Sequence, residues 1–121
     1  MEDAFEKREK SEEAKFKLDA EKRFKAEARR NKLLGIWAAD RMGMTKSEGE
    51  AYAREVVRAD LSEPGAGYIV RKVTADAESR NVVIGEDEIR ERMERLYAVA
   101  LEQIGGEYPE PLGPDHGRVG D

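Results

Sequence analysis

The pattern of hydrophobic and polar positions is clearest between Phe16 and Met42 and predicts the longest helix of the chain. Hydrophobic residues recur there at intervals of three and four, which places their side chains along one side of an α-helix. This hydrophobic stripe consists of Phe16, Ala20, Phe24, Ala28, Leu34, Trp37, Ala38 and Met42. Because a single helix of this kind gains little stability on its own, the stripe predicts that other helices cover it.

A second helix is predicted to begin with a capping box, formed either by Thr45 with Glu48 or by Ser47 with Glu50. Pro64 ends it, because proline cannot donate a backbone hydrogen bond and restricts the residue before it. Its predicted buried side consists of Ala53, Val56, Val57 and Leu61, with Tyr52 at the edge.

Two further helices are predicted, one from Tyr68 to about Ser79 and one from Glu86 to Ile104. The β-branched run that follows Tyr68 also suits a short strand, but no second strand is available to pair with it, so a helix is expected. The turn over residues 81–85 is expected to place one or two hydrophobic side chains under the bundle. The predicted inward residues are Ile69, Val70, Val73, Ala77, Ile89, Met93, Leu96, Tyr97, Ala100 and Ile104.

These elements predict an all-α fold, in which residues 16–104 form a four-helix bundle. Charged residues make up 40% of the chain and hydrophobic residues 39%, which suits a helical bundle with a thin core. Residues 1–15 are helix-prone but have few hydrophobic side chains, so they are expected to form a mobile arm. Residues 105–121 are rich in glycine and proline and are expected to be disordered.

The composition argues against several kinds of chemistry. Cysteine is absent, and the single histidine, His116, lies in the Gly/Pro-rich tail, so no catalytic residue and no metal site is predicted. A net charge of -5 argues mildly against general nucleic-acid binding. The sequence shows neither a secretory signal nor an apolar run of membrane-spanning length, and a cytoplasmic protein is therefore expected.

A cluster of basic residues lies in the first predicted helix and consists of Lys22, Arg23, Lys25, Arg29, Arg30 and Lys32. Such a surface is most often only solvated. It also suits a phosphate-bearing ligand, an acidic protein surface or nucleic acid. Trp37 lies about two turns beyond Arg29 and Arg30, and an aromatic ring near guanidinium groups can hold a nucleotide.

Two segments resemble a known family. Residues 23–39, RFKAEARRNKLLGIWAA, are similar to the signature of the zeta subunit, a small inhibitor protein of certain bacterial F-type ATP synthases. Residues 50–60, EAYAREVVRAD, resemble the second segment of that family. Weaker similarity at residues 70–73 and 89–93 extends the resemblance over roughly residues 5–104.

The resemblance implies a non-catalytic regulator: a four-helix bundle whose mobile arm inhibits ATP hydrolysis by entering a catalytic interface of the soluble head of the synthase. The arm residues so implied are Ala4, Phe5, Glu6, Lys7, Arg8, Glu9 and Lys10. The resemblance also implies ADP or ATP as a regulatory ligand, without a required cofactor. The candidate nucleotide-binding residues are Arg29, Arg30, Asn31 and Trp37.

The implied location is cytoplasmic, peripheral to the membrane-bound synthase, without insertion into the membrane. The sequence departs from the family in its tail after Ile104 and in the connection at residues 63–67. The main alternative is a helical adaptor that docks an acidic protein or nucleic acid through its basic first helix.

Overall fold

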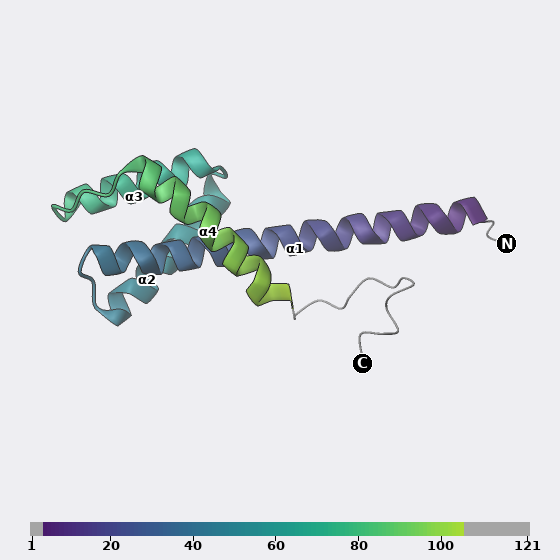
Figure 1. The fold of residues 1–121 in the computed structure, drawn as a ribbon, viewed down its shortest axis with the longest axis horizontal. Helices are drawn as coiled ribbons and strands as arrows, with labels where there is room; N and C mark the ends of the chain where they lie inside the picture. Colours follow the sequence, from purple (N-terminus) through teal and green to yellow (C-terminus); the bar gives the residue numbers. More distant parts are fainter. Residues whose placement is uncertain (1–3, 106–121) are drawn as a thin grey trace.

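The computed structural model describes the backbone of residues 4–105, and within it the side chains of Lys15 and of residues 17–105. This part of the chain forms four helices and no strand (Figure 1). They are α1 (Ala4–Arg41), α2 (Lys46–Ser62), α3 (Ala66–Ser79) and α4 (Glu86–Gly105). The predicted all-α four-helix bundle is therefore confirmed, and the segment after Tyr68 is a helix rather than a strand.

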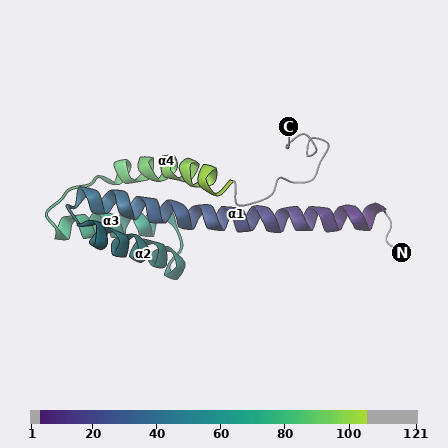
Figure 2. The ribbon, with the colours of Figure 1, turned by 90° about the horizontal axis from the view of Figure 1, so that it is seen from below.

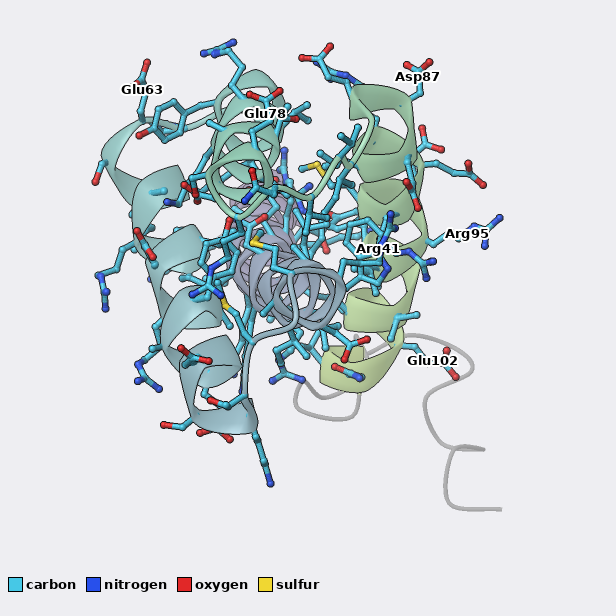
Figure 3. The ribbon with its side chains drawn as sticks, turned by 90° about the vertical axis from the view of Figure 1, so that its left-hand side faces the viewer. Arg41, Glu63, Glu78, Asp87, Arg95 and Glu102 are labelled. Carbon is cyan, nitrogen blue, oxygen red and sulfur yellow. The ribbon has the colours of Figure 1, made fainter. Side chains whose placement is uncertain are left out.

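The four helices are arranged around α1. In the view along α1, Glu63, just after α2, and Glu102 on α4 lie on opposite sides of it, and α3 lies between α2 and α4 (Figure 3). Contacts of α1 with α2 and α4 account for most of the packing between helices. The C-terminal part of α1 is thus the centre of the bundle.

The first helix begins earlier than predicted, at Ala4 rather than Phe16. The segment from Ala4 to Leu34 contains neither glycine nor proline and is rich in alanine, glutamate and lysine. These residues favour a helix even where no core is available. That residues 1–15 move as an arm stays a prediction, because a helical backbone does not by itself decide it. The predicted disordered tail lies outside the described residues, apart from Gly105, which ends α4.

Most predicted core positions are buried. All four inward residues predicted on α3 have 0% of their surface exposed, and Leu34, Ala38 and Met42 of α1 are also buried. The main core is formed by Leu34, Ala38, Ala39, Met42, Tyr52, Val56, Ile69, Val70, Val73, Ala77, Ile84, Ile89 and Met93. Of the turn between α3 and α4, Ile84 is buried and Val82 packs against the core, as expected.

Among the side chains that the structure describes, which do not include Phe16, two that were predicted to face the core are exposed. Phe24 has 61% of its surface exposed because it lies ten residues before Leu34, the first residue of α1 that belongs to the main core. Leu61 is 58% exposed in the last turn of α2. Conversely, Ala26, Asn31 and Ala39 are buried although the predicted stripe omits them.

Helices α1 and α2 approach closely at glycine. A Cβ atom added to Gly35 would lie 2.6 Å from the Cα of Ala53, which is closer than real side chains permit. Gly49 of α2 lies similarly against Ala39 of α1, where an added Cβ would meet the alanine methyl at 3.4 Å. The absence of a side chain at Gly35 thus sets the distance between the two helices.

The capping box of α2 is formed by Thr45 and Glu48, which decides between the two predicted alternatives. The Thr45 hydroxyl accepts a hydrogen bond from the Glu48 backbone N–H at 3.2 Å, and Glu48 Oε1 accepts one from the Thr45 N–H at 2.8 Å. Hydrogen bonding to the Glu48 carboxylate, first from the Thr45 backbone N–H and then from the Thr45 side chain, favours its charged form and lowers its pKa. Gly43, at φ 74°, provides the left-handed residue that separates α1 from α2.

Candidate functional site

The N-terminal part of α1 extends past the ends of the other three helices (Figures 1 and 2). The bundle end is marked by Ala26, which packs with Ala100 and Ile104 of α4, and by Arg29, whose Nη1 donates to Gln103 Oε1 at 3.1 Å. From residue 4 to residue 25 the helix is about 33 Å long at 1.5 Å per residue. We call residues 4–25 the projecting segment.

The predicted arm residues, Ala4 to Lys10, form the first turns of this projecting segment. The helix brings them together at its tip, the point of the described chain most distant from the bundle (Figure 1). Their side chains lie outside the described residues. Phe24 is exposed nearer the bundle, and Lys15, Lys17, Asp19 and Glu21 are exposed between the two.

The four predicted nucleotide-binding residues do not converge on one pocket. Asn31 is only 1% exposed, and its Nδ2 donates to Asp60 Oδ2 of α2 at 3.0 Å. Its Oδ1 accepts a hydrogen bond from Arg30 Nε at 3.1 Å, while Asp60 Oδ1 accepts one from the Gly65 N–H at 3.3 Å. Asn31 therefore links α1 to the end of α2 and the start of α3, and holds the Arg30 side chain in place.

Trp37 is half-buried, and two arginine side chains, one from α1 and one from α4, lie over its ring. The Cζ atoms of Arg41 and Arg92 lie 5.4 and 5.1 Å from the centroid of its ring, within the range of cation–π attraction. Arg41 also forms a 2.6 Å ion pair with Glu88. These contacts make Trp37 part of the junction between α1 and α4.

Arg30 borders a separate hollow between α1, α4 and the start of α3. Its guanidinium lies over the ring of Tyr97, with Cζ 5.8 Å from the centroid. The hollow has a volume of about 290 Å³ and is lined by Arg30, Ala66, Arg90, Met93, Glu94 and Tyr97. Arg90 and Tyr97 were not predicted as site residues, although their spacing of seven places them on one side of α4. Arg29 does not line this hollow and instead contacts Gln103.

A polar network joins α2 to α3. The Tyr52 hydroxyl donates to Asp76 Oδ2 at 2.8 Å, and Lys72 Nζ lies 3.0 Å from the same oxygen and 3.1 Å from Glu55 Oε1. Burial and the bond to Asp76 raise the pKa of Tyr52. Burial opposes the charge on Lys72, but the bonds to Asp76 and Glu55 outweigh this and raise its pKa. The network holds the two helices together.

Within residues 4–105 we find no group of three or more acidic, histidine or cysteine side chains arranged to bind a metal ion. None of the helices in that range combines the length and apolar character needed to cross a membrane.

Residues 1–103 match the model of a family described as ATPase inhibitor subunit zeta. The fold is similar to a structure titled "Solution NMR structure of the protein", with a TM-score of 0.61 and 46% sequence identity, over 70% of this chain and 96% of that one. A search of curated protein sequences gave no match.

Proposed function

The chain belongs to the ATPase inhibitor subunit zeta family, and on this basis we propose that it inhibits ATP hydrolysis by a bacterial F-type ATP synthase. In this proposal the tip of α1 enters a catalytic interface of the soluble head, on the cytoplasmic side of the membrane. The observation that supports this route is the projecting segment, which extends as a helix away from the bundle (Figure 2). A protruding helix can enter a cleft that the wider bundle cannot.

Inhibition of this kind needs no catalytic residue. A catalytic interface of a rotary ATPase must open and close in each cycle, and a helix held inside it prevents closure. Because α1 is helical from Ala4, its entry costs less ordering than the folding of an unstructured segment. We assign Phe5 as the apolar anchor and the charged residues from Glu6 to Lys10 as partners of charges in the cleft.

Deletion of residues 1–15 tests this proposal. The truncated protein should no longer inhibit ATP hydrolysis by the isolated head, while its melting temperature stays unchanged, since Ala26 is the first buried residue among the described side chains. Deletion of residues 106–121, which lie beyond the family match, is the matched control and should leave inhibition intact. Full inhibition by the protein without residues 1–15 would refute the proposed route.

We also propose a site for ADP or ATP in the hollow beside Arg30. Arg30 and Arg90 are suited to phosphate, since guanidinium groups bind phosphate oxygens in pairs, and Tyr97, whose ring Arg30 covers, is the aromatic side chain of the same lining. Glu94 in the lining of the hollow would disfavour a highly charged ligand, which favours ADP over ATP. Asn31 acts in this site only through its bond to Arg30.

Calorimetric titration with ADP tests this second site. Arg30→Ala and Arg90→Ala should each weaken binding about tenfold, the typical loss of one charged hydrogen-bonding partner. Lys32→Ala is the control, because Lys32 belongs to the same basic cluster but lines a different groove, beside α2. Absence of heat at millimolar ADP, or an equal loss in the Lys32 variant, would contradict the site.

A further inference from the structure

Phe24 is a large hydrophobic side chain exposed on an otherwise charged helix. Its exposed fraction is 61%, and Ala20, one turn earlier on the same side, is half-buried. The described residues that line the hollow beside Phe24 are Ala20, Glu21 and Lys25, all of them from α1 itself. No described side chain of α2, α3 or α4 lines this hollow.

The position of Phe24 relative to α2 follows from helix geometry. Phe24 precedes Asn31 by seven residues, so it lies on the same side of α1, about 10 Å closer to the tip. Asn31 faces the end of α2 through its bond to Asp60. Leu61, the residue after Asp60, is 58% exposed. Phe24 thus lies on the tip side of the junction between α1 and the end of α2, which we call the corner, and Leu61 is an exposed apolar residue at that end of α2.

The corner is fixed relative to the tip. No glycine or proline interrupts α1 between Ala4 and Leu34, so Phe5 and Phe24 are on one continuous helix, about 28 Å apart along its axis. A partner that binds the tip therefore meets the same helix again near the corner, provided that its surface extends that far. The two contacts would be parts of one continuous interface.

The charge of the projecting segment on both sides of Ala20 and Phe24 indicates the chemistry of this partner surface. Residues 15–25 carry five cationic and two anionic side chains, in a chain whose net charge is -5. They are Lys15, Lys17, Lys22, Arg23, Lys25, Asp19 and Glu21. Such a segment is complementary to an acidic rim around an apolar patch.

We infer that Ala20, Phe24 and Leu61 form a second contact with the soluble head of the synthase, on an apolar patch with acidic edges outside the catalytic interface. This inference rests on the proposed function and extends it from the tip of α1 to the corner. We call this second contact the shoulder contact. The shoulder contact supplies binding energy, while the tip blocks the catalytic cycle. The head thus holds α1 at two points along its length.

The experiment compares inhibition of ATP hydrolysis by full-length variants on the isolated head. Phe24→Ala should raise the concentration for half-inhibition about tenfold, as expected for an aromatic anchor of an interface. Leu61→Ala should raise it less, and Phe24→Leu, which keeps an apolar side chain, should stay close to the unmodified protein. The matched control is Val83→Ala, because Val83 is 85% exposed and precedes α4 at the opposite end of the bundle.

The outcomes separate the two proposals. Alanine favours a helix more than phenylalanine, so weaker inhibition by Phe24→Ala cannot come from a weaker helix. Equal inhibition by Phe24→Ala and the unmodified protein, with loss of inhibition on deletion of residues 1–15, would refute the shoulder contact and keep the proposed function. A lower melting temperature of Phe24→Ala would also refute it, since Phe24 would then stabilise the bundle. If the unmodified protein does not inhibit, both proposals fail.

Discussion

The two parts of α1 form one helix for different reasons. From Ala26 to Arg41 the helix is covered by α2, α3 and α4, and Leu34 has 0% of its surface exposed. The other three helices end before the projecting segment (Figure 2), and Phe24, one of its described side chains, is 61% exposed. In the first part, tertiary packing stabilises the helix, whereas in the second, only helix propensity and pairs of charges along the helix favour it.

This difference shows what a hydrophobic stripe means. Phe24 and Leu34 belong to the same stripe in the sequence, and the stripe alone predicts the same environment for both. A stripe indicates that a helix requires a partner but does not say where the partner comes from. For Leu34 the partner is the rest of this chain. For Phe24, on our inference, it is another protein.

The largest difference between the covered part of α1 and the projecting segment is expected when one large hydrophobic side chain is truncated in each. Leu34→Ala should lower the free energy of unfolding by about 3 kcal/mol, because it removes a fully buried side chain and leaves a cavity. Phe24→Ala should change it by less than about 0.5 kcal/mol, the usual range for surface substitutions. Urea unfolding of both variants measures the difference. Similar losses at the two positions would mean that the projecting segment packs on the bundle.

A second test adds one methyl group instead of removing several. Gly35→Ala should destabilise the bundle by about 2 kcal/mol, because the new Cβ meets the Ala53 backbone at 2.6 Å and α1 must move away from α2. Gly105→Ala is the control, since nothing lies within 4 Å of its added Cβ in α4. Thermal unfolding should separate the two variants clearly. An unchanged melting temperature for Gly35→Ala would show that the two helices do not require this close contact.

A third test concerns the buried amide close to the boundary between the two parts of α1. Asn31→Ala should cost about 1.5 kcal/mol, because it removes a buried hydrogen bond and leaves Asp60 without that donor. The double variant with Asp60→Ala should cost less than the sum of the two single variants, since each already breaks the same bond. Additive losses in urea unfolding would show that the bond does not contribute to stability.

The sequence was sufficient to predict much of the bundle. The three- and four-residue spacing placed all of Ile69, Val70, Val73 and Ala77 correctly, because a helix covered along one side has a single buried face. The capping box was narrowed to two alternatives, and only the structure distinguished Thr45 from Ser47. Here local rules and tertiary packing agree.

Other features depend on the arrangement of helices and were not predictable from spacing. Asn31 is polar and was taken as a ligand contact, yet it is buried because its side chain meets Asp60, which is distant in sequence. Trp37 and Arg30, both on α1, contact α4 at two different places: Trp37 contacts Arg92, and Arg30 contacts Tyr97. The exposure of Phe24 depends on where α2 and α4 end relative to α1, which no local pattern encodes.

A smaller loss of stability is expected at the start of α2, far from the projecting segment. Thr45→Ala should lower the free energy of unfolding by about 1 kcal/mol at pH 7, since it removes the hydroxyl that caps the helix. Ser47→Ala, at the alternative box position, should have almost no effect and is the control. Inhibition of ATP hydrolysis should be unchanged in both variants at temperatures where the bundle is folded. Reduced inhibition by Thr45→Ala under those conditions would mean that inhibition depends on the start of α2 as well as on the projecting segment.

The same cap should respond to pH through Glu48. Its pKa is lower in the folded protein than in the unfolded chain, so the carboxylate stabilises the fold above its unfolded pKa and loses this effect as the pH falls through the folded value. The difference in unfolding free energy between the unmodified protein and Glu48→Gln should therefore be constant near neutral pH and shrink in acid. Because both proteins share every other titrating group, the difference isolates this carboxylate. A difference that grows in acid would show that Glu48 is not held in its charged form by the Thr45 hydrogen bonds.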